Sequence, residues 1–128
     1  MNSSFPRHII GICGRAGVGK DTVASLIAQT LLEQNLGYAG WIHAFADPLK
    51  DCVAVAFGIP INDFYDGEKK EAVNEFWNLT PRNILQFMGT EVFRNAISGL
   101  SPELQNKFWS RRMHLLLTGK DDCVYTDE

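Results

Sequence analysis

Long apolar runs are missing from this 128-residue chain, and none approaches the roughly 20 residues that a membrane-spanning helix needs. A basic excess is missing too, because 12 Lys and Arg face 15 Asp and Glu and leave a net charge of −3. General binders of nucleic acid or of membrane surfaces normally carry the opposite balance, so we expect neither partner. Residues 1–8 are too polar for a secretory signal, and we expect a cytoplasmic protein.

Paired cysteines are also missing. The three cysteines are far apart and form no C-x-x-C motif, which excludes a disulfide framework or a zinc site of the usual spacing. Each lies among apolar residues, and we expect Cys13, Cys52 and Cys123 to be buried, reduced packing residues. With 45% hydrophobic and 21% charged residues, the chain has an ordinary globular composition, and its length suits one domain over residues 1–128.

Short apolar segments alternate with amphipathic ones along the chain. Residues 8–13, 38–45 and 123–126 are the predicted strands. Helices are predicted from Lys20 to about residue 35, from Asp47 to just before Gly58, from Thr80-Pro81, and from Ser101-Pro102 to about Leu117. Residues 66–71 indicate a solvated turn and a helix start. This alternation predicts an α/β fold: a parallel sheet with helices on both faces.

The segment between the first strand and the first helix reads G-R-A-G-V-G-K-D-T, which is G-x-x-x-x-G-K followed by Asp and Thr. Glycines let successive backbone N–H groups point at phosphate oxygens, and the helix dipole adds positive potential. We expect Lys20 to reach the β- and γ-phosphates and the Thr22 hydroxyl to bind Mg²⁺, although Asp21 holds the usual Ser/Thr position. The predicted ATP-phosphate residues are Arg15, Ala16, Gly17, Val18, Gly19, Lys20, Asp21 and Thr22.

The helix from Pro81 carries a polar stripe at four-residue spacing, made of Arg82, Gln86, Thr90 and Arg94. Arginine forks suit a monophosphate, and a glutamine amide can read the edge of a nucleobase. We therefore predict that Arg82 and Gln86 receive an acceptor nucleotide, with Thr90 on the same stripe. The alternative is an ordinary solvated helix face. No D-x-x-G or N-K-x-D motif follows the glycine loop, which disfavours a GTPase switch.

Three further polar residues lie where ligands gather in parallel sheets, at the carboxyl ends of the predicted strands. Asp47 and Lys50 open the helix after the second strand, as candidates for substrate binding or simply as a helix cap and a surface lysine. Asp127 ends the third strand, the usual place of an acid that orients Mg²⁺ through water, or is a terminal surface residue. Lys20, Arg82 and Asp127 are the predicted catalytic residues.

Three blocks occur in order over nearly the whole chain: G-R-A-G-V-G-K-D-T-V-A, F-A-D-P-L-K-D-C-V-A-V-A-F-G and P-R-N-I-L-Q-F-M-G-T-E-V-F-R. Together they resemble the deoxynucleoside monophosphate kinases of tailed bacteriophages. The resemblance implies a three-layer P-loop kinase fold and Mg²⁺-dependent transfer of the γ-phosphoryl group of ATP to a deoxynucleoside 5′-monophosphate, in the host cytoplasm. It places residues 15–22 on the ATP phosphates and Lys50, Arg82 and Gln86 toward the acceptor. Trp109 lies nearby in that family and is otherwise a core aromatic.

In that family an arginine-bearing lid and the region that binds the ATP base follow the strand that carries the Asp. Here the sequence ends at Glu128, so we expect the N-terminal portion of a kinase domain, with an acceptor region at about residues 47–118. Two alternatives stay open: another P-loop kinase acting on a small metabolite, and a nucleotide-binding fragment without catalysis. The accepted bases and the oligomeric state, a homodimer included, are also open.

Overall fold

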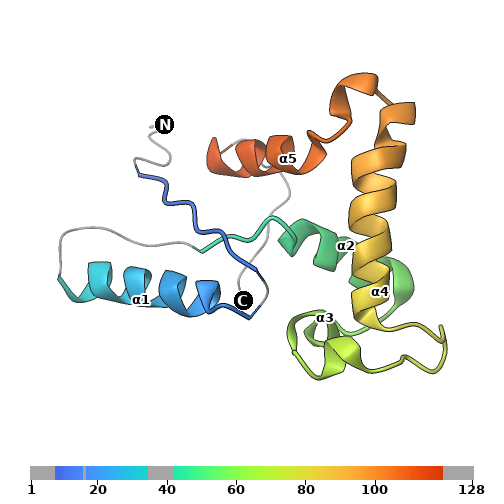
Figure 1. Ribbon diagram of the computed structural model, residues 1–128, viewed down its shortest axis with the longest axis horizontal. Coiled ribbons are helices and arrows are strands. Elements are labelled where there is room, and N and C mark those ends of the chain that lie inside the picture. The colour runs from blue at the N-terminus through green and yellow to red at the C-terminus, as the bar shows by residue number, and fades with distance from the viewer. Residues whose placement is uncertain (1–7, 16, 35–41, 120–128) are drawn as a thin grey trace. The chain divides into compact units, whose positions relative to one another are not determined.

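The computed structural model describes residues 8–15, 17–34 and 42–119 (Figure 1). The chain divides into two compact units, one ending at Ala44 and the other beginning at Phe45.

The predicted parallel sheet, and with it the three-layer α/β fold, is wrong: the described ranges form helices and turns and contain no strand. Residues 8–13 have no regular secondary structure, and Ile9 and Ile10 are each 62% exposed, whereas a strand inside a sheet would bury them. Residues 42–44 are also irregular, while 38–41 and 123–126 lie outside the described ranges. An apolar run makes a strand only where a neighbour receives its N–H and C=O groups, and the sequence pattern does not contain that information.

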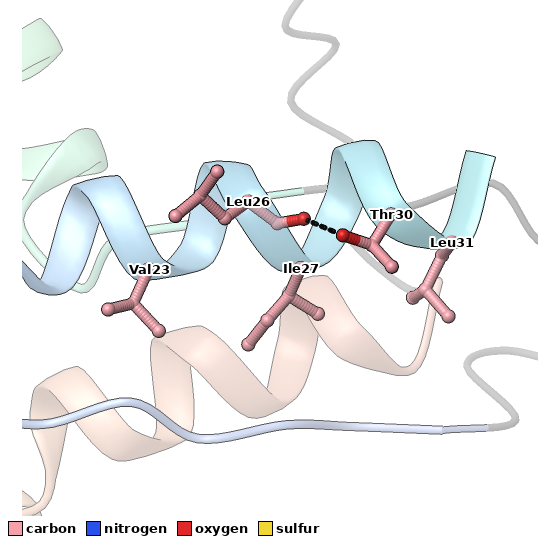
Figure 2. A pocket seen from close by; sticks show the side chains of 5 residues that line it. All are labelled: Val23, Leu26, Ile27, Thr30 and Leu31. Atoms are coloured by element: carbon pink, nitrogen blue, oxygen red, sulfur yellow. Dashed lines mark hydrogen bonds between the residues drawn. The ribbon is translucent and has the colours of Figure 1, made fainter. Parts of the chain in front are cut away.

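The first unit contains α1 (Lys20–Glu33), which begins where the sequence predicts and ends close to the predicted residue 35. No described side chain of α1 is buried. Its apolar face is a shallow surface, shown in Figure 2, on which the Thr30 hydroxyl donates to the Leu26 carbonyl at 2.7 Å. This apolar face consists of Val23, Leu26, Ile27, Thr30 and Leu31.

The second unit opens with α2 (Asp47–Phe57), α3 (Asn62–Tyr65) and the 3₁₀ turn η1 (Lys69–Glu71). The prediction for α2 is confirmed at both ends. Pro48 lies in its first turn, and Gly58 follows its last residue with φ 64°, donating its N–H to the carbonyl of Val55. The predicted turn at residues 66–71 is also confirmed, because the Asp66 carboxylate accepts the backbone N–H groups of Glu68 and Lys69 at 3.0 Å each.

The helix predicted from Pro81 begins as α4 (Pro81–Gln86) and is capped by Thr80, which exchanges hydrogen bonds with Asn83. It continues as a π-helix, η2 (Phe87–Asn95), which the sequence pattern does not predict. The 3₁₀ turns η3 (Ala96–Gly99) and η4 (Pro102–Leu104) follow. The helix predicted from Ser101 is therefore split: Asn106 adopts φ 59°, and α5 (Phe108–Leu117) begins only after it.

The hydrophobic core found among the described residues lies wholly in the second unit. Its buried members come from α2, α3, α4 and the link after α2: Leu49, Val53, Ala54, Ile59, Phe64 and Ile84. Phe57, Leu85, Met88, Phe93 and Trp109 pack against them while keeping partial exposure. The core fixes the positions of α2, α3 and α4, which carry most of the predicted acceptor residues.

The prediction that the cysteines are buried is wrong where it can be checked. Cys13 and Cys52 are both exposed and form no disulfide, and Cys123 lies outside the described ranges. Cys13 follows the exposed isoleucines of the first unit, and Cys52 lies on the outer side of α2. Apolar neighbours in the sequence therefore do not make these two cysteines buried in the structure.

Candidate functional site

The glycine loop of the first unit closes on itself through its lysine. The Lys20 ammonium donates to the Gly14 carbonyl at 3.1 Å, which brings the lysine head back across the loop to its first residue. Gly17 and Gly19 have φ values of 81° and 93°, in the left-handed region that residues with a side chain rarely adopt. Glycine at these two positions is therefore what allows the loop to curl and α1 to begin at Lys20.

The first turn of α1 has no side-chain cap. Gly19 occupies the N-cap position and makes no capping hydrogen bond, so the first-turn N–H groups have no side-chain acceptor there. Thr22 and Asp21 are both exposed in this turn. Such a helix start attracts anions, and its first turn also carries the negative charge of Asp21.

The oxygen donors for a metal are few in this loop. The described ranges hold no group of three or more His, Cys, Asp or Glu side chains that could bind a metal ion. Magnesium is usually held by one or two protein oxygens together with water and substrate phosphates, so a single Thr22 hydroxyl fits that mode and a full protein cage does not. Two predicted site residues, Ala16 and Asp127, lie outside the described ranges.

Arg82, the predicted acceptor-phosphate residue, pairs with an acid that the sequence analysis missed. Its Nε donates to Glu71 Oε1, which links α4 to η1. The two side chains are 41% and 54% exposed, so this ion pair is open to solvent. The partners lie 11 positions apart in sequence and in separate elements, so no helical spacing could have indicated the pair.

The π-helix changes the direction of the predicted polar stripe. Four residues overshoot one α-helical turn, whereas in i→i+5 geometry four residues fall short of a turn. The stripe therefore drifts one way from Arg82 to Gln86 on α4 and back the other way along η2, where Thr90 and Arg94 lie. Gln86, Thr90 and Arg94 are all exposed.

Asp47 and Lys50 meet at a residue that the sequence analysis did not single out. The Tyr65 hydroxyl donates to Asp47 Oδ1 at 2.9 Å, and the Lys50 ammonium lies 4.2 Å from the centre of the Tyr65 ring. Burial raises the pKa of the neighbouring Asp51 carboxyl, and the charge of Asp47 raises it further. The first turn of α2 and the last residue of α3 thus form one polar cluster, made of Asp47, Lys50 and Tyr65.

Trp109 packs in the second unit. Its indole N–H donates to the Gly89 carbonyl at 3.1 Å, and its ring lies 4.8 Å from that of Phe108 and 5.4 Å from that of Phe93, measured between centroids. These contacts match the packing alternative considered for this residue. A substrate contact of Trp109 stays a prediction.

Comparisons with known proteins give one informative result. No protein-family model matches the chain, and no solved structure matches it. It is 32% identical over 110 residues to a protein of Acanthamoeba polyphaga mimivirus named "Putative deoxynucleotide monophosphate kinase". The match covers 84% of this chain and 53% of that protein, so the chain spans about half the length of its relative.

This relative bears on two earlier expectations. Its name agrees with the predicted resemblance to nucleotide kinases, while its origin in a giant virus gives no support to a restriction to tailed bacteriophages.

No helix within the described ranges is both long enough and apolar enough to cross a membrane.

Proposed function

We propose that this chain belongs to a nucleotide kinase that transfers the γ-phosphoryl group of ATP to a deoxynucleoside 5′-monophosphate. The observation that carries the proposal is the glycine loop, in which Lys20 reaches back to the Gly14 carbonyl at an uncapped helix start. The name of the viral relative supports the choice of acceptor. The donor site comprises residues 15–22, and the acceptor site draws on Asp47, Lys50, Arg82, Gln86, Thr90 and Trp109.

The proposed reaction needs positioning and charge stabilisation and no covalent enzyme intermediate. An oxygen of the acceptor phosphate attacks the γ-phosphorus of ATP, and the bond from that phosphorus to the β–γ bridging oxygen breaks. ADP leaves with the electron pair, and the acceptor becomes a diphosphate. Lys20 stabilises the charge on the transferring group, for which it must exchange the Gly14 carbonyl for phosphate oxygens.

Magnesium, when bound, neutralises charge on the ATP phosphates. In this chain Thr22 would hold it, together with Asp127 if the sequence prediction for that residue is correct. The role of Asp21 in the same turn is then electrostatic: its carboxylate repels phosphate and favours a cation beside it.

Arg82 would bind the acceptor phosphate by exchanging one anion for another. A solvent-exposed ion pair contributes about 0–1 kcal/mol, so the Glu71 carboxylate is a weak competitor. A phosphate can accept two parallel N–H bonds from the guanidinium, which makes it a better partner than an exposed carboxylate. Gln86, one helical turn further on, can then contact the base or sugar.

A coupled ADP-release assay with each of the four deoxynucleoside monophosphates tests this function. We expect turnover that depends on the acceptor, and a loss of about 100-fold in kcat/KM for Lys20→Ala, similar to the removal of one electrostatic donor in other enzymes. Lys107→Ala, which removes an exposed lysine from the second unit, is the matched control and should change turnover less than twofold.

Other outcomes of the same assay would replace the proposal. ADP release that needs no acceptor indicates an ATPase, and a response to other phosphate acceptors alone indicates a small-metabolite kinase. ATP binding that is lost in Lys20→Ala, without any phosphoryl transfer by the unsubstituted chain, indicates a nucleotide-binding module.

A further inference from the structure

Tyr65 contacts two charged side chains of the same helical turn. Its hydroxyl donates to Asp47 at 2.9 Å, and its ring lies under the Lys50 ammonium at 4.2 Å. Asp47 and Lys50 are three residues apart in α2, so both project from one side of its first turn. These are also the two residues of α2 that the sequence analysis assigns to the substrate. One tyrosine therefore contacts both candidate substrate residues of this helix.

The contacts restrict side chains that would otherwise move. A lysine has a long flexible stem, and fixing its ammonium costs rotamer entropy. The Tyr65 ring attracts the Lys50 ammonium by a cation–π interaction and so holds it in place before any ligand arrives. The hydrogen bond from the Tyr65 hydroxyl does the same for one oxygen of Asp47. Asp47 and Lys50, an acid and a base at i and i+3, thus each contact a different part of Tyr65.

The main anchor of α3 is not Tyr65 but its neighbour Phe64, which is fully buried in the core with 0% exposure. Tyr65 itself is 48% exposed, so it contributes less to the core than Phe64 does. The two polar contacts of Tyr65 are therefore better explained by what they position than by what they stabilise.

We propose that Tyr65 is a positioning residue of the acceptor site, holding the Lys50 ammonium and the Asp47 carboxylate ready for a deoxynucleoside monophosphate. This inference rests on the proposed function. The Lys50 ammonium receives the acceptor phosphate, while the Asp47 carboxylate accepts a hydrogen bond from the sugar or base. Tyr65 touches neither reacting atom and acts through these two side chains.

The test measures dNMP affinity by calorimetry and acceptor KM in the kinase assay for Tyr65→Leu and Tyr65→Phe. Tyr65→Leu loses the ring and the hydroxyl, and we expect about tenfold weaker dNMP binding. Tyr65→Phe keeps the ring under Lys50, and we expect about threefold weaker binding. ATP affinity should stay within twofold of that of the unsubstituted chain. Phe76→Leu, which removes an 84% exposed aromatic ring from the same unit, is the matched control.

Two further measurements separate positioning from general damage. In a Lys50→Met background, Tyr65→Leu should weaken dNMP binding much less than tenfold, because the ammonium that the ring positions is gone. In NMR spectra, the Lys50 ε-methylene protons should show an upfield ring-current shift that persists in Tyr65→Phe and is lost in Tyr65→Leu. If Tyr65→Leu does not fold, Tyr65→Phe and the Lys50→Met comparison still decide the matter.

The possible failures are distinct. If the unsubstituted chain binds dNMPs and Tyr65→Leu binds them equally well, the role of Tyr65 is overturned while the proposed kinase function stands. A drop in thermal stability with unchanged dNMP affinity would likewise make Tyr65 a structural tether. If the unsubstituted chain binds no dNMP at all, the acceptor site is overturned, and the inference about Tyr65 with it.

Discussion

The helices of the two units differ in how many of their side chains are buried. In the unit that begins at Phe45, α2, α3 and α4 surround a core that includes fully buried Phe64 and Val53. In the unit that ends at Ala44, α1 has no buried side chain among those described, and Leu26 on its apolar face is 56% exposed. A local signal, Gly19, marks the start of α1, whereas α2, α3 and α4 also pack on residues distant in sequence.

The same contrast separates the glycine loop of one unit from the residues of the other unit that we propose for the acceptor, the acceptor half. The glycine loop is built from neighbours in sequence, because Gly17, Gly19 and the Lys20–Gly14 contact all lie within one short segment. The acceptor half is built from tertiary partners: Glu71 for Arg82, and Tyr65 for Lys50. Substitutions in the core should therefore affect the acceptor half more strongly than the loop.

The largest effect is expected at the centre of the core. Phe64→Ala should lower the free energy of unfolding of the second unit by about 3–5 kcal/mol, because it removes a fully buried ring. Leu26→Ala, on the exposed face of α1, should change the free energy of unfolding of the first unit by less than about 0.5 kcal/mol. Denaturant unfolding followed by far-ultraviolet circular dichroism, which detects the helices of both units, measures both. Equal effects would show that the two units do not differ in packing as described.

A second pair of substitutions adds one methyl group in each unit. A Cβ at Gly89 would lie 2.9 Å from a Leu49 methyl inside the core, and one at Gly14 would lie 2.7 Å from a methyl of exposed Val18. Leu49 is confined and Val18 can rotate away. The clash with Leu49 lowers stability by more than the gain in helix propensity raises it. Gly89→Ala should therefore lower the free energy of unfolding by about 1 kcal/mol. Gly14→Ala should change it by less than about 0.5 kcal/mol, and a larger loss than for Gly89→Ala would contradict this comparison.

A smaller effect is expected at the ion pair of the acceptor half. Glu71→Gln removes the carboxylate that pairs with Arg82, and we expect dNMP affinity to rise about two- to threefold while the unfolding free energy falls by less than about 1 kcal/mol. The gain in affinity should shrink at high salt, where exposed charges are screened. Glu75→Gln, which removes an exposed acid that forms no ion pair with the described residues, is the control. Weaker dNMP binding in Glu71→Gln would instead make Glu71 a support for Arg82.

The smallest expected effect concerns pH. Because burial and the charge of Asp47 raise the pKa of Asp51, the folded chain holds that proton more tightly than the unfolded chain does. The stability contributed by Asp51 is therefore fully present below pH 3.8 and is lost as the pH rises through the raised pKa. At neutral pH, Asp51→Asn should be more stable than the unsubstituted chain by a few tenths of a kcal/mol after solvent screening. At acid pH, where the Asp51 carboxyl is protonated in both the folded and the unfolded chain, the variant should lose this advantage.

Asp66 provides the opposite case. Backbone N–H groups of Lys69 and then Glu68 lower the pKa of this carboxyl, so its contribution to stability is present above pH 3.8 and is lost as the pH falls through the lowered pKa. Melting temperatures of Asp51→Asn and Asp66→Asn, measured from acid to neutral pH, should therefore diverge from the unsubstituted chain in opposite directions. Parallel curves would contradict both assignments.

The sequence predicted those features of the fold that short segments determine. Gly19 before α1, Pro48 and Gly58 around α2, and Thr80-Pro81 before α4 all mark helix ends in the structure. The strands were wrong, because the apolar run at 8–13 has the composition of a strand but no described neighbour that pairs with it. The break before α5 depends on the φ of 59° at Asn106, which no pattern of apolar residues reveals.

The candidate site divides in the same way. The motif around Lys20 predicted a curled loop, and the Lys20–Gly14 contact agrees with it. Tyr65 lies 15 residues beyond Lys50 in a separate short helix, and Glu71 lies in a 3₁₀ turn, so neither could be inferred from helical spacing. The ligand roles of the predicted residues stay predictions until the assays above are made.

The π-helix η2 makes the helix that begins with α4 tolerant of changes in length. Each of its turns contains about one residue more than an α-helical turn, so η2 can lose a residue and become α-helical without a gap in its hydrogen bonds. Because an α-helix winds more tightly than a π-helix, such a deletion would change the angular position of the residues that follow by less than the 100° that one residue spans in an α-helix. Insertions and deletions between Phe87 and Asn95 would thus redirect side chains such as Arg94 and leave the helix continuous.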